Sequence, residues 1–91
     1  MSVRTNYEQA AHAEFAAAQL KLKALSARAQ AVPEKERAAA KALLTQAQSK
    51  HDEALHLLEL LKRTGESGWV ERRIALEQSL RELRAALASV P

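Results

Sequence analysis

Residues 54–70 read ALHLLELLKRTGESGWV, and this stretch decides the fold. Its five leucines between Leu55 and Leu61 cover most of the circumference of a helix, because successive side chains turn by about 100°. A single neighbouring helix cannot bury all of them, so we expect two neighbours. The glycines that follow weaken a helix by about 1 kcal/mol each. The stretch therefore predicts the end of one helix, a flexible linker at 64–68 and the start of another helix.

Two further signals divide the chain before this stretch. Thr5 and Glu8 have the spacing of a capping box, which predicts that the first helix begins near residue 5. Val32 precedes Pro33, and the proline ring disfavours the helical conformation in the residue before it. We therefore expect a tight turn here rather than the alternative, a kink within one long helix. Pro33 itself suits the first turn of the helix that follows.

The end of the chain follows the same rules. Gly65 is well placed as a left-handed C-terminal cap for the second helix, and Ser67 can cap a third helix that opens at Trp69. Together these signals predict helices over residues 5–31, 33–63 and 69–88, in one helical domain that spans residues 1–91.

The composition agrees with an all-helical chain. The 91 residues include 20 Ala and 14 Leu, only two Gly and two Pro, and 3% aromatic residues. So few turn formers and β-branched residues exclude all-β and α/β folds. We therefore expect an all-α fold: a long antiparallel helical hairpin, similar to a coiled coil, with a third, shorter C-terminal helix. The result is a three-helix bundle or, if the third helix packs on another chain, a helical oligomer.

Apolar residues recur at alternating spacings of four and three in the first two helices, as in the seam of a coiled coil. They are Ala11, Phe15, Ala18, Leu22, Leu25, Ala29 and Val32, and then Ala40, Leu44, Ala47, Ala54, Leu58 and Leu61. Nearly half are alanine, which lets two backbones approach closely but buries little area. His51 occupies one seam position. In an antiparallel hairpin it comes opposite Glu14 or His12, so we expect one of these as its partner.

The polar residues indicate no catalytic, cofactor or metal site. Cysteine is absent, and neither a glycine-rich phosphate loop nor a Ser/His/Asp constellation occurs. Glu53 and His56 have the Glu-x-x-His spacing of di-iron bundles, but such sites need a second copy and two more carboxylates. The net charge of +3 is distributed among mixed charges. We therefore expect neither an enzyme nor a small-molecule substrate.

The surplus of leucine predicts a non-catalytic helical protein–protein interaction module: a small adaptor, a chaperone-like subunit or an assembly component. Its partner is another protein, a second copy of this chain, or both. The candidate partner-binding residues are Leu55, Leu58, Leu61, Trp69, Ile74, Leu76, Leu80, Leu83 and Leu87. The third helix docks either in cis, within the monomer, or in trans, on another chain. Its glycine-containing linker predicts that it is the most movable element.

An alternative function is nucleic-acid binding through the arginines of the third helix, which are Arg72, Arg73, Arg81 and Arg84. Glutamates alternate with them and interrupt a continuous phosphate-binding face, so nucleic acid is the second choice. The first residues lack the apolar core of a signal peptide, and no apolar run approaches the ~20 residues that span a bilayer. We therefore expect no membrane insertion and a cytoplasmic location.

Overall fold

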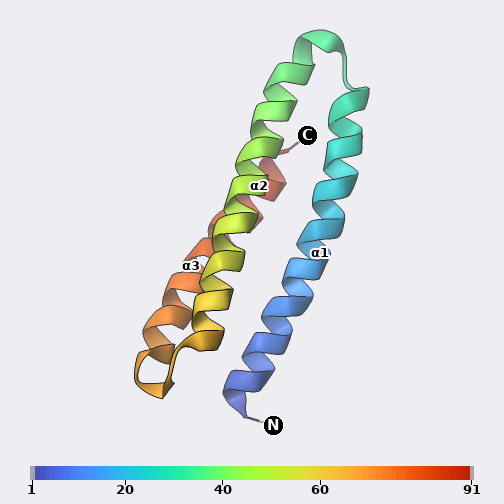
Figure 1. The fold of residues 1–91 in the computed structure, drawn as a ribbon. Coiled ribbons are helices and arrows are strands. Elements are labelled where there is room, and N and C mark those ends of the chain that lie inside the picture. Colours follow the sequence, from blue (N-terminus) through green and yellow to red (C-terminus); the bar gives the residue numbers. More distant parts are fainter. Residues whose placement is uncertain (1, 91) are drawn as a thin grey trace.

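Three helices make up nearly all of residues 2–90, the part of the chain that the computed structural model describes. They are α1 (Val3–Ala31), α2 (Glu34–Arg63) and α3 (Glu66–Ser89). α1 and α2 form an antiparallel hairpin, and α3 runs back along α2, antiparallel to α2 and parallel to α1 (Figure 1). The molecule measures 51 × 20 × 16 Å. The expected all-α fold, with a long hairpin and a shorter third helix, is confirmed.

The junction between α1 and α2 is a turn, as expected, and not a kink. Val32 is extended, with φ −74° and ψ 158°, which is the conformation that a residue before proline prefers. Pro33 is the N-cap of α2, so this helix begins one residue later than predicted. The carbonyl of Pro33 accepts a hydrogen bond from the Glu36 N–H at 2.9 Å. Arg37 Nη2 reaches back to the Val32 carbonyl at 3.5 Å.

The start of α1 lies earlier than the sequence indicated. Ser2 is the N-cap, and its Oγ accepts a hydrogen bond from the Thr5 N–H at 3.1 Å. The expected capping box of Thr5 and Glu8 is therefore wrong, because Thr5 lies inside the first turn. Glu8 instead pairs with Arg4, whose Nε lies 3.3 Å from Glu8 Oε1. Both Ser2 and Thr5 can cap a helix, and the earlier cap allows additional backbone hydrogen bonds to form.

The connection between α2 and α3 is shorter than predicted. Only Thr64 and Gly65 lie between the two helices, because α3 begins at Glu66 instead of Trp69. Gly65 has a φ of −71°, so the expected left-handed cap is wrong. Ser67 lies inside α3 and does not cap it. The glycine-rich linker expected from the sequence is therefore mostly the first turn of a helix.

Thr64 ends α2 through its own backbone and side chain. Its N–H donates to the Leu61 carbonyl at 3.1 Å, and its hydroxyl donates to the Leu60 carbonyl at 2.6 Å. The chain then returns so tightly that a Cβ on Gly68 would lie 3.0 Å from Thr64 Cγ2. Glycine at position 68 thus serves a close approach within the turn, not a flexible linker.

α2 is the central helix of the core because it packs against both α1 and α3. The largest fully buried side chains are those of Leu58 and Leu61 on α2 and of Leu76 and Leu83 on α3. The leucine-rich end of α2 thus has the two neighbouring helices that its pattern requires. Toward the hairpin turn the buried side chains include the much smaller Ala29 and Ala40.

His51 occupies a buried seam position, as predicted, but its partners differ from those expected. The ring of Phe15 packs edge-on against the imidazole, with centroids 5.5 Å apart, and His51 Nδ1 lies 3.2 Å from Asp52 Oδ1. Glu14 points toward α3 instead, where it pairs with Arg84. The reason is the register of α1: Phe15, and not Glu14, occupies the seam position opposite His51.

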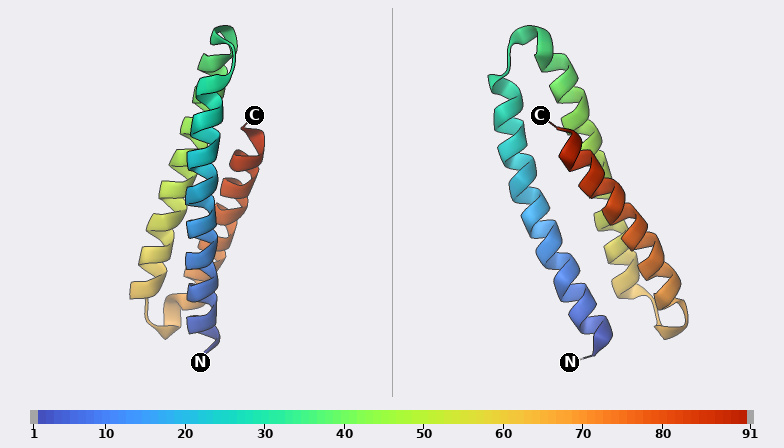
Figure 2. Two further views of the ribbon diagram at one scale, coloured as in Figure 1. Left: turned by 90° about the vertical axis from the view of Figure 1, so that its right-hand side faces the viewer. Right: turned by 180° about the vertical axis from the view of Figure 1, so that it is seen from behind.

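α3 does not reach the turn between α1 and α2 (Figure 2). Glu82 on α3 lies level with Lys50 on α2, since Lys50 Nζ is 2.8 Å from Glu82 Oε1. One heptad later α3 ends at Ser89, level with Leu43 on the antiparallel α2. Because Phe15 lies opposite His51, this level corresponds to about residue 23 on α1. Within the described part of the chain, residues 24–42 therefore form only a two-helix hairpin. We call residues 24–42 the uncovered end.

Candidate functional site

The chain itself buries most of the predicted partner-binding residues. The side chains of Leu58, Leu61, Trp69, Leu76, Leu80, Leu83 and Leu87 are each at most 9% exposed. They belong to the core that α3 shares with the hairpin, so α3 docks in cis in this structure. Of the predicted set, Leu55 and Ile74 reach the surface, with exposed fractions of 37% and 60%. In this conformation a partner can contact these two residues and not the other seven.

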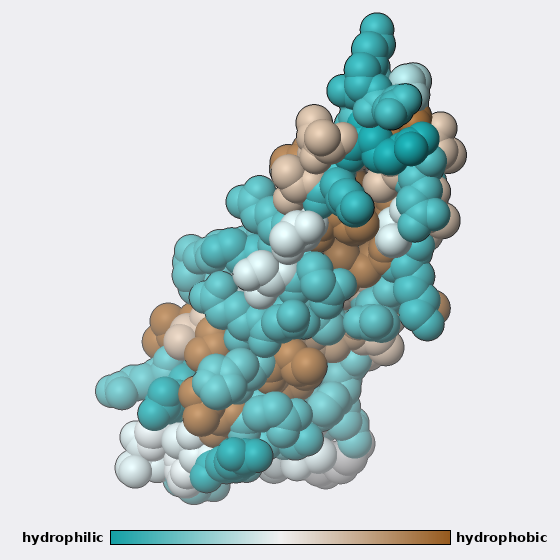
Figure 3. Space-filling view, turned by 45° about the horizontal axis from the view of Figure 1, so that its top comes forward, coloured by the Kyte–Doolittle hydropathy of each residue, from teal (hydrophilic) through white to brown (hydrophobic). Residues whose placement is uncertain are grey.

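The exposed apolar side chains do not form one continuous face. Those most exposed are Val3, Leu20, Leu55, Val70 and Ile74, which are distributed over all three helices. In the view of Figure 3, apolar atoms (brown) reach the surface in separate patches among hydrophilic ones (teal). The leucines of the expected interaction face are therefore mostly buried between the helices of this chain.

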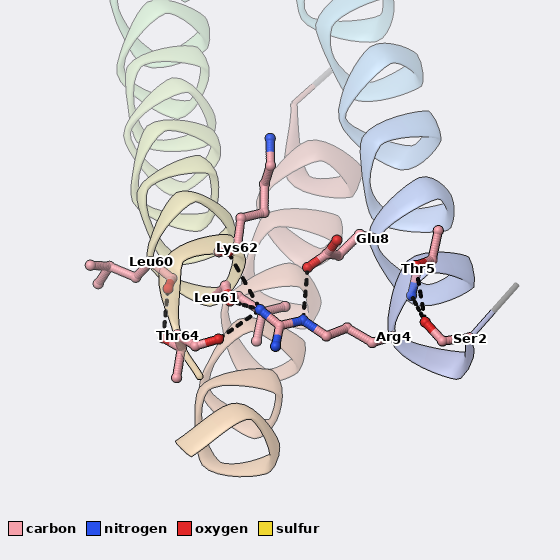
Figure 4. A network of polar contacts seen from close by, with 8 residues as sticks. All are labelled: Ser2, Arg4, Thr5, Glu8, Leu60, Leu61, Lys62 and Thr64. Carbon is pink, nitrogen blue, oxygen red and sulfur yellow. Dashed lines mark hydrogen bonds and ion pairs between the residues drawn. The ribbon is translucent and has the colours of Figure 1, made fainter. Parts of the chain in front are cut away.

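Arg4 joins the start of α1 to the end of α2 (Figure 4). Its Nη2 donates to the carbonyl oxygens of Leu61 at 3.1 Å, Lys62 at 3.4 Å and Thr64 at 2.7 Å. The last turn of a helix leaves its carbonyls without intrahelical partners, and a cation there also complements the helix dipole. Arg4, from another helix, thus binds the carbonyls at the end of α2, which we expected a cap at Gly65 to satisfy. No local pattern connects residues so far apart in the chain, so sequence reasoning missed it.

An aromatic cluster beside Arg4 holds α3 against α1. The rings of Tyr7 and Trp69 pack edge-on with centroids 5.7 Å apart, and the guanidinium of Arg73 lies 5.9 Å and 5.5 Å from these two centroids. Burial, together with the nearby carboxylate of Glu77, raises the pKa of Tyr7 to about 12. The cluster is a clamp at the end of the molecule opposite the hairpin turn.

The pockets at this clamped end are small. One of about 150 Å³ is lined by Arg4, Glu66, Trp69 and Val70, and one of about 120 Å³ lies between α1 and α3. Sites for small organic ligands usually have roughly 300–1,000 Å³. Arg4 lines the first of these pockets, and its Nη2 already donates hydrogen bonds to carbonyls at the end of α2.

One row of side chains on α1, spaced by seven residues, faces α3. Tyr7 contacts the aromatic cluster, and Glu14 accepts two hydrogen bonds of 2.7 Å from Arg84. Lys21 and Arg28 continue this row, and both are exposed. Residues seven apart share a face in a coiled-coil hairpin. The α1 row therefore becomes cationic at Lys21, which is level with the last turn of α3, and extends past the end of α3 at Arg28.

A second row, on α2, borders the other side of α3. Lys50 pairs with Glu82 at 2.8 Å, and this contact raises the pKa of Lys50 and lowers the pKa of Glu82. Leu57 and Leu43, one heptad to either side of Lys50, are partly buried against the core. Glu36 continues this α2 row toward the turn. Beyond Ser89 the two rows border a surface that α3 does not cover.

We call this surface the uncovered face and define it by Arg28, Glu36 and Leu43, where Leu43 marks its border with α3. It belongs to the most cationic part of the molecule. The uncovered end, residues 24–42, carries four Lys and Arg against two Glu, whereas the rest of the chain carries ten against nine Asp and Glu. The positive net charge of the chain is thus concentrated where α3 is missing.

Two of the four arginines of the predicted nucleic-acid face are engaged within the chain. Arg84 forms the two-pronged pair with Glu14, and Arg73 lies over the rings of the aromatic cluster. Arg72 and Arg81 are exposed. α3 therefore does not present the four cations together on an open surface.

No group of three or more His, Asp or Glu side chains among residues 2–90 is arranged to hold a metal ion. None of the helices in this range is both long and apolar enough to cross a bilayer. Comparisons with known protein families, with curated proteins and with solved structures find no match for this chain.

Proposed function

We propose that this chain is a non-catalytic helical protein–protein interaction module, a small adaptor or assembly component, and that its partner binds the uncovered face. The observation that carries the proposal is the early end of α3. Along the covered part of the hairpin, α3 packs against the seam and pairs with both rows. The same seam and the same rows continue along the uncovered end without that third helix.

The two ends of the molecule differ in how completely they are packed. Arg4 and the aromatic cluster clamp one end, and large leucines are fully buried behind them. At the uncovered end the buried residues are Leu25, Ala29 and Ala40, of which the two alanines nearer the turn fill little space. Small side chains allow helix axes to approach closely, and a thin core gains most from an added helix. A helix supplied by a partner would complete a three-helix arrangement there.

The remaining exposed members of the predicted partner-binding set, Leu55 and Ile74, stay predictions. Both lie on the covered part of the molecule and are distant along the chain from the uncovered face. The nucleic-acid alternative is not proposed for α3, because Arg73 and Arg84 contact groups within the chain.

Site-specific photo-crosslinking tests the proposal with a control on the same helix. Ala39 lies one turn before Leu43 and therefore borders the uncovered face, whereas its neighbour Ala38 points elsewhere; both are exposed. A photo-reactive residue at 39, in the native cell, should form an adduct with a discrete protein, and one at 38 should not. The captured protein is then purified and its binding to the full chain is measured directly.

Steric block supplies the second arm of this experiment. Ala39→Trp should weaken binding of the purified partner by at least about tenfold, because the indole occupies the space of the incoming helix. Ala38→Trp should leave binding unchanged, and both variants should keep the wild-type helix content. Absence of an adduct at position 39, equal adducts at both positions, or equal binding by the two tryptophan variants would overturn the proposal.

A further inference from the structure

We infer that two copies of this chain can exchange α3, so that the α3 of each copy packs on the hairpin of the other, and that Arg4 is the contact that holds α3 on its own hairpin. The partner is a second copy, and the surface is the one that α3 covers in this structure. This exchange involves the covered part of the hairpin and does not depend on the partner proposed for the uncovered face.

The connection between α2 and α3 consists of Thr64 and Gly65 alone. Their φ angles, −82° and −71°, are close to the helical value of about −63°, and only their ψ angles, 136° and 174°, are extended. Rotation about two ψ angles would therefore join α2 and α3 into one straight helix from Glu34 to Ser89. No proline interrupts this range, and its two glycines are its least favourable helix formers.

A straight connection takes α3 away from its own hairpin. α3 is antiparallel to α2 in the fold, whereas in a continuous helix it extends past the clamped end in the direction of α2. A second straight copy, placed antiparallel to the first, would restore the packing of α3 on α1 and α2 at both ends of a symmetric dimer. The ion pairs Glu14–Arg84 and Lys50–Glu82 would then form between copies, together with the apolar contacts of α3. The interface is complementary because it is the contact that α3 already makes.

The balance between the two arrangements depends on the connection and on the concentration of the chain, because the contacts of α3 are otherwise the same. A short connection gives α3 an effective concentration of roughly millimolar at its own hairpin. Below this concentration the monomer is favoured unless the connection itself prefers to be straight. Each dimer contains two connections, so any such preference acts twice on the dimerisation constant.

Arg4 stabilises the bent connection and not the straight one. Its Nη2 donates to the carbonyls of Leu61, Lys62 and Thr64 (Figure 4). In a continuous helix each of these carbonyls accepts the N–H of the residue four positions later, and successive carbonyls are turned by about 100° around the axis. One nitrogen cannot then contact all three, and its shortest bond, of 2.7 Å to Thr64, depends on the chain turning back at that residue. Loss of Arg4 should therefore favour the exchange.

Two substitutions of Gly65 test the exchange in opposite directions. A Cβ at this position meets no atom within 4 Å, so Gly65→Ala leaves the bent form undisturbed and favours a helix through the connection. Gly65→Pro fits the φ of −71° and the extended residue before it, but a proline within a helix removes a hydrogen bond and clashes with the preceding turn. Both chains are refolded over a range of concentrations and measured by light scattering. Gly65→Ala should dimerise at concentrations at least about tenfold lower than the wild type or Gly65→Pro.

Substitution of Arg4 tests its part in the balance. Arg4→Ala should also dimerise at concentrations at least about tenfold lower than the wild type, because only the bent form loses contacts. Arg63→Ala removes an exposed cation from the same end of α2 and should behave like the wild type. Addition of Gly65→Pro to Arg4→Ala should restore the monomer, which a dimer caused by general destabilisation would not do.

Disulfide formation shows which copy supplies α3, since the chain contains no cysteine. In the Gly65→Ala background, a copy with Glu14→Cys and a copy with Arg84→Cys are refolded together, and one of them is isotope-labelled so that mixed pairs are recognised by mass. A mixed disulfide should form, because residues 14 and 84 contact each other across the α1–α3 interface. The matched mixture of Ala38→Cys with Arg84→Cys should form little of it, because residue 38 lies in the uncovered end beyond α3.

Three results would overturn the inference: equal dimerisation of Gly65→Ala and Gly65→Pro, monomers of both Gly65→Ala and Arg4→Ala up to about 1 mM, or equal yields of the two mixed disulfides. A dimer that Ala39→Trp abolishes and Gly65→Pro leaves unchanged would form through the uncovered face and would also overturn it. Circular dichroism reports the helix content of each variant. If Gly65→Pro loses helix content, the comparison of Gly65→Ala with the wild type and the disulfide yields decide.

Discussion

Replacement of Arg4 by alanine tests whether a contact between the two ends of the hairpin stabilises the fold. Alanine is at least as good a helix former as arginine, so local propensity alone predicts no loss of stability at this position in α1. Any loss must come from the contacts of the guanidinium. These are three hydrogen bonds, of 2.7, 3.1 and 3.4 Å, to carbonyls at the end of α2.

The magnitude follows from these contacts. One hydrogen bond that involves a charged group contributes roughly 1.5–3 kcal/mol. Because the side chain of Arg4 is 27% exposed and solvent screens its charge, we assign roughly this amount to its three bonds together. The Glu8 pair adds a few tenths of a kcal/mol, and the Trp69 ring, 5.9 Å from the guanidinium carbon, adds about 0.5 kcal/mol. We expect Arg4→Ala to lower the free energy of unfolding by about 2 kcal/mol, which lowers the melting temperature of a chain of this size by about 10 °C.

Chemical denaturation followed by circular dichroism is the suitable assay, because the fluorescence of Trp69 would itself respond to the loss of Arg4. Arg63→Ala removes an exposed cation from the last turn of α2 and should change stability by less than about 0.5 kcal/mol. Glu8→Ala isolates the contribution of the ion pair with Arg4. If Arg4→Ala differs from the wild type by no more than Arg63→Ala does, the carbonyl contacts do not stabilise the fold and the reasoning is refuted.

Three further predictions concern the contact of α3 with the rest of the chain. The pKa of Tyr7 is about 12 in the fold against 10.0 for the ordinary group, so the unfolded chain loses this proton first and the free energy of unfolding falls as the pH rises from 10 towards 12. Tyr7→Phe should remove this part of the loss. Because Tyr7 is the single tyrosine, its phenolate absorbance reports the pKa directly. Replacing a helical glycine by alanine usually raises the free energy of unfolding by about 1 kcal/mol, but Gly68→Ala should raise it little, since the added Cβ meets Thr64 Cγ2 at 3.0 Å. In a Thr64→Ser background, which lacks Cγ2, Gly68→Ala should give the full increase, and a double-mutant cycle of unfolding free energies measures this difference. Leu80→Asp buries an unpaired carboxylate and should lower the free energy of unfolding by several kcal/mol. Ile74→Asp, at a position 60% exposed on the same helix, should lower it by less than about 1 kcal/mol. Equal melting temperatures of the two variants would show that α3 does not dock as described.

The structure also explains why an exposed leucine-rich face was expected and not found. The leucines of α2 between residues 55 and 61 surround the helix, and such a pattern requires two neighbours whichever chain supplies them. α3 supplies the second neighbour within the same chain, and it fully buries Leu58 and Leu61. α3 is too short to supply a third helix along residues 24–42, and the uncovered face results from that difference in length.

The sequence by itself determined the helices, their number and most of the core. Helical periodicity and the proline at 33 are local properties, and they predicted the hairpin turn and the end of α2 at residue 63 correctly. The four-and-three spacing identified the seam, including the buried position of His51. Such features depend on residues within one or two turns of each other, so they can be read from the chain before it folds.

Only the tertiary structure decided what depends on contacts between distant residues. The end of α2 needs no left-handed glycine because Arg4, from the other end of the hairpin, binds its carbonyls. Glu14 pairs with Arg84 of α3, a contact between residues 70 positions apart in the chain. The uncovered face exists because α3 ends at Ser89, level with Leu43, and that level is set by how the helices pack. A hydrogen bond or ion pair across the fold outweighs a local preference of about 1 kcal/mol, and no pattern along the sequence specifies which distant side chain will make it.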